Sequence, residues 1–115
     1  TRQLGTSSLA DYGNGVATDS SDNIYVTGYT SGGLDGNTSS GGVLDLFLVK
    51  YNSSGTKQWT KLLGTTTDDY GMEVTVDSSN NIYVTGLTNG GLVGKTNSGG
   101  NDIFLVKYNS DGVLQ

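Results

Sequence analysis

An internal repeat constrains this chain more than any other feature of its sequence. The segment DSSDNIYVTGYTSGGL at 19–34 returns as DSSNNIYVTGLTNGGL at 77–92. The segment DLFLVKYNSSG at 45–55 returns as DIFLVKYNSDG at 102–112. The spacing between the copies shortens by one position from the first pair to the second. This slip falls in a glycine-rich stretch, where a change of length favours a loop. Two such copies predict similar supersecondary units that stack on one another.

Each copy contains short runs of β-branched and aromatic residues, which are typical of strands. Asp, Asn, Ser and Gly clusters between the runs predict tight turns. In the third run, Phe47 and Val49 fall on one face and Leu46 and Leu48 on the other, so this strand is expected to be covered on both sides. The predicted strands are Gly15–Asp19, Asn23–Tyr29, Asp45–Tyr51 and Lys57–Leu63 in the first copy, and Glu73–Asp77, Asn81–Leu87 and Asp102–Tyr108 in the second.

Four short antiparallel strands per repeat predict the blades of a β-propeller. A β-solenoid or a stand-alone sandwich is the alternative, but a solenoid pairs its strands in parallel, and the short turns here favour antiparallel hairpins. The fold class is therefore predicted as all-β, with two four-stranded antiparallel propeller blades per chain. Residues 1–5 are predicted as a closing strand segment, 6–64 as the first blade, and 65–115 as the second, whose fourth strand is incomplete.

The motifs themselves are similar to a known family. Asp11-Tyr12-Gly13, Asn23-Ile24-Tyr25-Val26-Thr27-Gly28 and the run 45–51, each present in both copies, resemble the SBBP family of bacterial β-propeller repeats. The resemblance implies a propeller fold, occurrence in large, often secreted or surface-associated bacterial proteins, and no shared catalytic residues. Only two repeats are present, fewer than family members carry, and they are unusually alike, which suggests recent duplication or a designed sequence.

The two ends of the sequence complement each other. Thr1–Gly5 matches Thr60–Gly64 in the predicted fourth strand, and Gln115 corresponds to Gln58. An isolated pair of blades would expose an apolar face at each end, and a propeller has about four to eight blades. We therefore expect identical copies to join head to tail, about three giving six blades or four giving eight. The residues expected to close the ring are Thr1, Arg2, Gln3, Leu4, Val113, Leu114 and Gln115.

The rival interpretations of the same ends are a fragment of a longer propeller and a monomer in an open form. The function expected from the repeat is structural, that of a self-assembling propeller unit whose partners are copies of itself. The alternative is a lectin-like module that binds a glycan through rim loops rich in Asn, Asp, Gly and Tyr.

Composition argues against several other function classes. The net charge is −5, and the six basic residues are scattered, so no electrostatic footprint for nucleic acid or anionic membrane is present. Histidine and cysteine are both absent, which removes the usual general base, the thiol nucleophile and the commonest transition-metal ligands. We therefore expect neither enzymatic activity nor a cofactor.

One pair of motifs could serve either ligand binding or packing. Asp11 and Tyr12, repeated as Asp69 and Tyr70, are predicted on the loops that enter each blade. They could line a sugar site at the rim, or the Asp could cap the loop while the Tyr packs between blades. Their presence in both copies favours the structural role. As a carboxylate pair for glycoside hydrolysis they lack the asymmetry that sets acid and base apart.

Two further features have structural interpretations. The oxygen-rich turns 19–23 and 77–81 resemble calcium loops, but the central Gly and the bidentate Glu of such loops are missing. Side-chain caps of hairpin turns are the favoured interpretation, and no metal site is predicted. Trp59 is the only tryptophan, and we expect it to pack on a blade rim.

Overall fold

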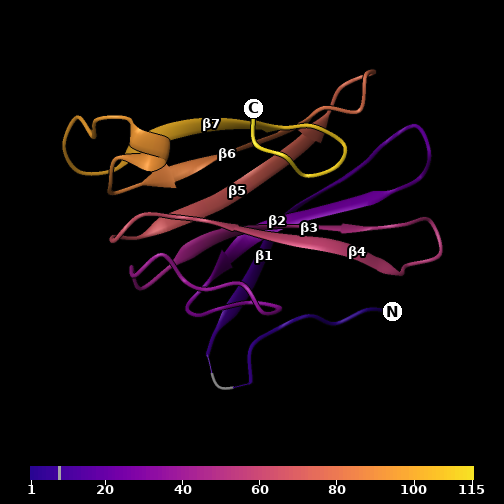
Figure 1. Ribbon diagram of the computed structural model, residues 1–115, viewed down its shortest axis with the longest axis horizontal. Coiled ribbons are helices and arrows are strands. Elements are labelled where there is room, and N and C mark those ends of the chain that lie inside the picture. Colours follow the sequence, from indigo (N-terminus) through magenta and orange to yellow (C-terminus); the bar gives the residue numbers. More distant parts are fainter. Residues whose placement is uncertain (8) are drawn as a thin grey trace.

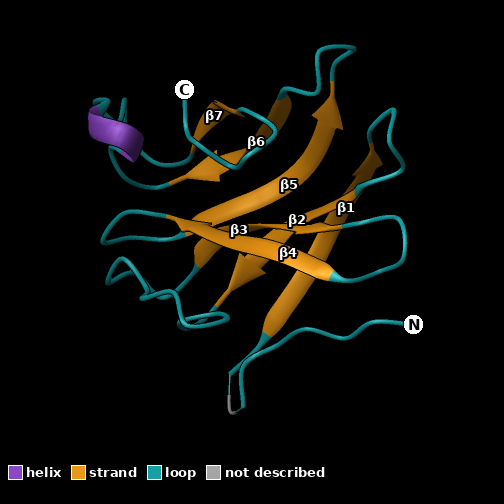
Figure 2. Cartoon of the chain, turned by 45° about the vertical axis from the view of Figure 1, so that its right-hand side comes forward, coloured by secondary structure: helices purple, strands orange, loops and turns teal. Residues whose placement is uncertain are grey.

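The computed structural model describes residues 1–7 and 9–115 and contains seven strands in two antiparallel sheets (Figures 1 and 2). The first sheet has the order β1-β2-β3-β4 and the second β5-β6-β7. This topology confirms two tandem blades, the second with three strands. The bounds are β1 Asp11–Thr18, β2 Ile24–Thr30, β3 Asp45–Tyr51, β4 Lys57–Leu63, β5 Asp69–Val76, β6 Ile82–Thr88, β7 Asp102–Tyr108 and a short 3₁₀ helix, η1, Leu92–Gly94.

The prediction for the first strand of each blade was wrong at its start. The Asp-Tyr-Gly motif was assigned to a loop, but β1 begins at Asp11 and pairs with the end of β2 before a bulge that leaves Asn14 without a partner. The same bulge in β5 leaves Met72 unpaired. A bulge inserts one residue and breaks the alternation of faces, so the glycine-rich sequence before it looks like a loop.

The two sheets stack face to face, and β5 packs against β1, β2 and β3. From the first blade, Tyr25, Leu46 and Leu48 enter the shared core; from the second, Val84 and Val106 meet them. Fully burying an aliphatic or aromatic side chain of this size is worth about 1.5–3 kcal/mol. Apolar packing between the blades therefore holds the pair together.

Glycine is required at close approaches both between the blades and between paired strands of one blade. A Cβ atom on Gly71 of β5 would lie 2.6 Å from the carbonyl oxygen of Gly28 in the neighbouring blade. A Cβ atom on Gly28 would lie 1.7 Å from the carbonyl oxygen of Tyr12 on the paired strand. Any larger residue would push these strands apart, which accounts for the Gly that ends the N-I-Y-V-T-G motif.

The second blade contains only the first pairing of a fourth strand. Tyr108 forms an antiparallel bridge with Leu114, as Tyr51 does with Lys57 in the first blade. The amide of Gln115 donates to the Lys107 carbonyl at 2.9 Å. Among residues 1–7 and 9–115, none pairs with the outer edge of β7 from residue 102 to 106.

Within the described chain, the helical content is one three-residue 3₁₀ turn, and no helix has the length and apolar character needed to cross a membrane.

Candidate functional site

The acidic residues of the Asp-Tyr-Gly motifs serve as caps. Asp69 is fully buried, and its carboxylate accepts hydrogen bonds from the Thr65 amide at 2.6 Å and from the hydroxyls of Thr65 and Thr88. Asp11 accepts from the Thr6 amide at 2.7 Å and the Thr6 hydroxyl at 3.1 Å. Burial acts to raise the pKa of Asp11, but the nearby Thr30 hydroxyl and the hydrogen bonds from Thr6 outweigh it and hold the pKa below its usual range. Both carboxylates therefore fix the segment that enters the blade.

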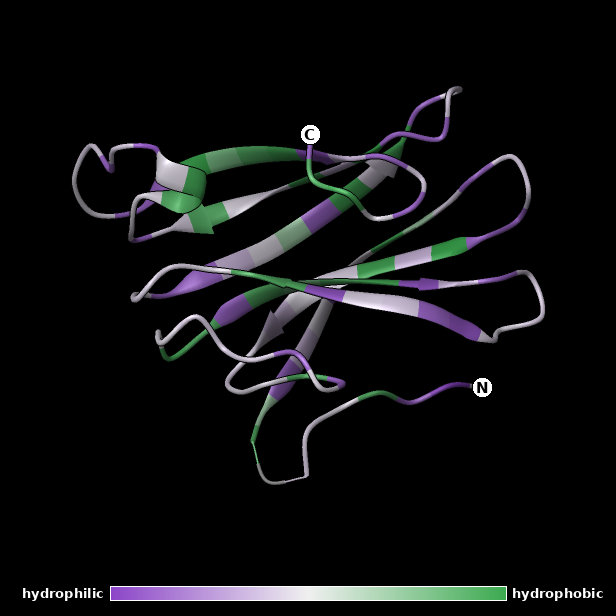
Figure 3. Ribbon diagram, in the orientation of Figure 1, coloured by the Kyte–Doolittle hydropathy of each residue, from purple (hydrophilic) through white to green (hydrophobic). Residues whose placement is uncertain are grey.

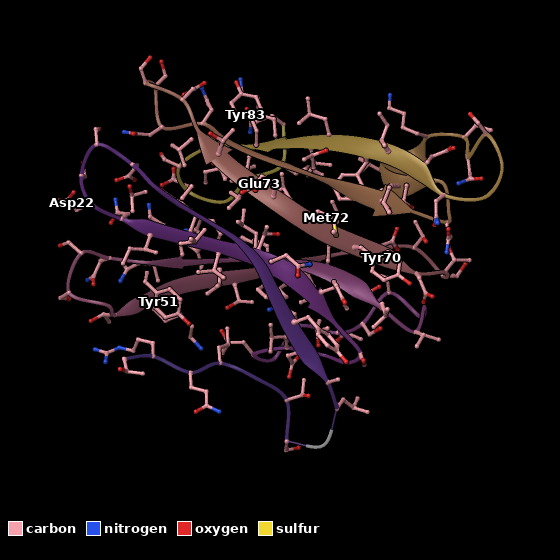
Figure 4. The ribbon with its side chains drawn as sticks, turned by 180° about the vertical axis from the view of Figure 1, so that it is seen from behind. Asp22, Tyr51, Tyr70, Met72, Glu73 and Tyr83 are labelled. Carbon is pink, nitrogen blue, oxygen red and sulfur yellow. The ribbon has the colours of Figure 1, made fainter. Side chains whose placement is uncertain are left out.

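The tyrosines of the same motifs belong to an aromatic cluster between the blades. The rings of Tyr12 and Tyr29 stack with centroids 4.7 Å apart, and Tyr70 meets Tyr29 edge-on at 5.0 Å. Figure 4 shows Tyr70 on β5, ahead of Met72 and Glu73. Burial and the neighbouring Asp68 carboxylate raise the pKa of Tyr70. Tyr70 thus packs against Tyr29 of the first blade, whereas Tyr12 is 48% exposed.

The oxygen-rich turns are hairpins capped by their own side chains. In the second blade, Asp77 accepts from the amides of Ser79 and Asn81, from the Asn81 side-chain amide and from the Tyr83 hydroxyl. The corresponding bonds form around Asp19 in the first blade. Donors fill the carboxylate oxygens, which is the arrangement expected of an Asp-capped turn.

These donors make one turn sensitive to acid. Bonds from the side chain and then the amide of Asn81 lower the pKa of Asp77 from 3.8 to about 2. A depressed folded-state pKa gives stability that is complete above the unfolded pKa and is lost as pH falls through the folded pKa. The stability difference between the wild type and Asp77→Ala should therefore be largest above about pH 4 and shrink toward pH 2. Urea unfolding at several pH values measures it; a difference independent of pH would contradict it.

Trp59 of β4 packs against the turn at Gly112 in the second blade. The sequence predicted packing at the rim of a blade for this residue. Its ring is 6.2 Å from that of Tyr25, and a Cβ atom on Gly112 would lie 3.0 Å from it.

Polar bonds between the blades were not predicted, because nothing in the sequence pattern marks them; three examples are those from Lys50, from Asn14 and from the Ser20 hydroxyl to Asn80. Lys50 donates to the Ser110 carbonyl at 3.1 Å. The side-chain amide of Asn14 donates to the Gly71 carbonyl at 2.8 Å.

One exposed apolar surface lies on the second blade. We define the trailing face as Thr85, Ile103 and Leu105, the residues equivalent to the buried Thr27, Leu46 and Leu48 of the first blade. Ile103 is 85% and Leu105 71% exposed, whereas Leu46 and Leu48 are both 0% exposed against the second blade. Figure 3 shows this hydrophobic β7 at one end of the molecule. Leu46 and Leu48 are thus buried because the second blade covers them, whereas the chemically similar Ile103 and Leu105 have no covering blade within the described chain and stay exposed.

A complementary surface lies on the first blade. We define the leading face as Val16, Val26 and Val49, which form one cross-strand row. The equivalent row in the second blade, which packs on the first, is Val74, Val84 and Val106. Val16 is 65% exposed, whereas Val74 is 4% exposed. A cavity of about 540 Å³ opens along the leading face, lined in part by Leu4, Leu34 and Phe47.

The N-terminal segment crosses the leading face. Leu4 packs against the cluster formed by Leu34, Phe47 and Val49, and the Arg2 guanidinium donates to the Gly55 carbonyl. At the opposite end of the molecule (Figure 1), a groove of about 430 Å³ follows β7 and reaches Leu114. The exposed blade faces were anticipated in general terms, but their residues can be assigned only by comparing burial at equivalent positions.

Two antiparallel sheets share one strand order and stack with the Leu46 and Leu48 face of the first against the Val74, Val84 and Val106 face of the second. This arrangement is that of adjacent β-propeller blades. The family model for the SBBP beta-propeller repeat matches residues 1–35 and 58–92. The chain belongs to the SBBP β-propeller repeat family, which confirms the resemblance found in the sequence. In each copy the match begins with the fourth-strand segment.

One curated relative is named for WD repeats. It is an uncharacterized WD repeat-containing protein of Acanthamoeba polyphaga mimivirus, 32% identical over 120 residues. The alignment covers 90% of this chain and 9% of the relative, so the chain spans a small part of that protein's length.

Proposed function

We propose that the chain is a structural, self-assembling propeller unit whose copies stack head to tail into a closed homo-oligomeric ring. The trailing face of one copy covers the leading face of the next. The observation that carries this proposal is the contrast in burial: Leu46 and Leu48 are fully buried, whereas Ile103 and Leu105, at the equivalent positions, are 85% and 71% exposed. The blade contact inside the chain shows how such faces pack.

Energetics favour covering both faces. Each large apolar side chain removed from water contributes about 1.5–3 kcal/mol, and Val16, Ile103 and Leu105 are all available. Association opposes this with about 4–15 kcal/mol of lost translational and rotational freedom. A single contact is therefore expected to be weak. Closing a ring stabilises every contact at once, because the last one forms within an assembly.

The copy number follows from the size of known propellers. With two blades per chain, about three copies give six blades and four give eight. Two copies would form a strained four-bladed ring. Heterologous contacts of this kind close when the rotation between copies permits and otherwise continue as filaments.

Light scattering of the chain over a dilution series tests the proposal. We expect a species of about three or four times the mass of one chain, which dissociates on dilution. A folded monomer of 11.9 kDa at all accessible concentrations would overturn self-assembly. The two faces would then be left for further blades of a longer chain.

Carbohydrate binding is the second candidate, and the exposed Tyr12 ring is the observation that favours it. However, the equivalent Tyr70 packs against the preceding blade, and the Asp69 carboxylate and the Oδ2 atom of Asp11 accept hydrogen bonds from the chain. A glycan array separates the two functions. Saturable binding that is lost in Tyr12→Ala and Tyr70→Ala would favour the lectin.

A further inference from the structure

We propose that Met72 is an oxidation site at the junction of the two blades, and that the Asn14 side chain holds the sulfoxide formed there. Met72 is the only methionine and cysteine is absent, so its sulfur is the only one in the chain. The co-substrate is a hydroperoxide, such as hydrogen peroxide, which supplies the oxygen atom. Neither residue belongs to the leading or the trailing face, so the site does not depend on the proposed ring.

The two residues occupy equivalent positions in the two blades. Asn14 is the unpaired residue of the bulge in β1, and Met72 is the unpaired residue of the bulge in β5. A bulge interrupts the strand pairing and redirects the side chain that it carries. The repeat therefore places an amide at one bulge and a thioether at the other.

The two bulges lie against each other where the blades meet. β1 packs beside β5, and a Cβ atom on Gly15 would lie 3.0 Å from the Cα atom of Glu73. Figure 4 shows Met72 with its sulfur on β5, between Tyr70 and Glu73. This close backbone approach holds the bulges at a fixed separation, which the Asn14 side chain spans.

The Asn14 side-chain amide contacts two acceptors of the second blade. Its nitrogen donates to the Gly71 carbonyl at 2.8 Å and lies 3.7 Å from the Met72 sulfur. A backbone carbonyl only accepts hydrogen bonds, so the Gly71 contact fixes which end of the amide faces β5. The amide nitrogen carries two N–H donors, of which one serves the carbonyl and the other faces the thioether. Because thioether sulfur is a weak acceptor, the second donor is poorly satisfied.

Oxidation would give that donor a stronger acceptor. A lone pair of the Met72 sulfur attacks one oxygen of hydrogen peroxide and the O–O bond breaks. The displaced hydroxide takes the proton of the transferred oxygen and leaves as water, while the sulfur becomes a sulfoxide. The side chain is 46% exposed, so peroxide can reach the sulfur and the polar product stays near water. The flexible methionine side chain can turn the new oxygen toward the Asn14 amide, and we expect this hydrogen bond to tighten the junction.

Mild treatment with hydrogen peroxide, followed by urea unfolding at one dilute protein concentration, tests the proposal. Intact mass and peptide mapping identify chains that carry one added oxygen at Met72. Because the net gain from one hydrogen bond is modest, we expect oxidation to raise the folding equilibrium constant about two- to tenfold. Methionine sulfoxide reductases should return it to its original value. An unchanged or lowered constant in the oxidised chain would overturn the proposal.

Variants at both positions separate the Asn14 contact from other effects of peroxide. Asn14→Ala removes the N–H donors, and Asn14→Asp removes them while keeping the side-chain shape, so oxidation should bring neither variant a gain. The effect of oxidation is compared within each variant, so the lost bond to Gly71 cancels. Met72→Leu has no sulfur, and peroxide should leave its stability unaltered. A gain in any of these variants equal to that of the wild type would contradict the site.

Discussion

Replacing Ile103 and Leu105 with aspartate is expected to leave a folded monomer. Both side chains are largely exposed within one chain, so the substitution should cost little folding stability. In the proposed contact they face Val16, Val26 and Val49, the residues of the leading face. Burying an unpaired carboxylate there costs several kcal/mol, more than a weak head-to-tail contact supplies. Light scattering measures the mass, and circular dichroism confirms the β fold.

Val43→Asp is the matched control for that experiment. Val43 is 70% exposed, lies in the loop between β2 and β3, and lines neither the leading-face cavity nor the groove along β7, so its variant should assemble like the wild type. Unchanged assembly of the Ile103→Asp, Leu105→Asp variant would exclude the trailing face as the contact. Loss of assembly in the Val43 variant would show that added charge alone is enough.

The second large effect is a loss of folding stability, and the equivalent residue in the other copy of the repeat is its control. Leu48→Ala should lower the free energy of unfolding by about 2–5 kcal/mol, because Leu48 is fully buried between the blades. The same change at the equivalent Leu105 should cost less than about 1 kcal/mol in dilute protein, since surface substitutions have small effects. Urea unfolding at low concentration measures both changes.

The difference between the two leucines should narrow as the protein concentration rises. Association adds a stabilising free energy that grows with the logarithm of the partner concentration above the dissociation constant, and Leu105 acquires the environment of Leu48 only in the assembly. A cost at Leu105 that equals that at Leu48 in dilute protein would mean that the trailing face is already covered within one chain. A cost that stays small at every concentration would mean that it is never covered.

The number and order of most strands could be predicted from the sequence, because the repeat and the apolar pattern both place strands at the same positions. The third and fourth strands match their predicted bounds, Asp45–Tyr51 and Lys57–Leu63. The first strand did not, because the bulge at Asn14 shifts the faces of β1 by one residue. A bulge is set by strand pairing, which a single run of residues does not reveal.

The residues of the two exposed faces were harder to predict from the sequence, for a different reason. Leu46 and Ile103 are nearly the same residue in nearly the same motif, yet one is fully buried and the other 85% exposed. The exposure of each residue depends on whether another blade packs against it. The sequence could therefore predict that the end faces are apolar, but not which of their residues are exposed. The hydrogen bonds that hold Thr6 on Asp11 likewise become visible only in three dimensions.

Native mass spectrometry of the unmodified chain at increasing concentration tests ring closure most directly. If trailing and leading faces join and close, the spectrum should pass from monomer to one dominant species of about three or four copies, with little above it. A continuous ladder of growing oligomers would show that the contact forms without closing. Monomer alone at every concentration would contradict the head-to-tail contact itself.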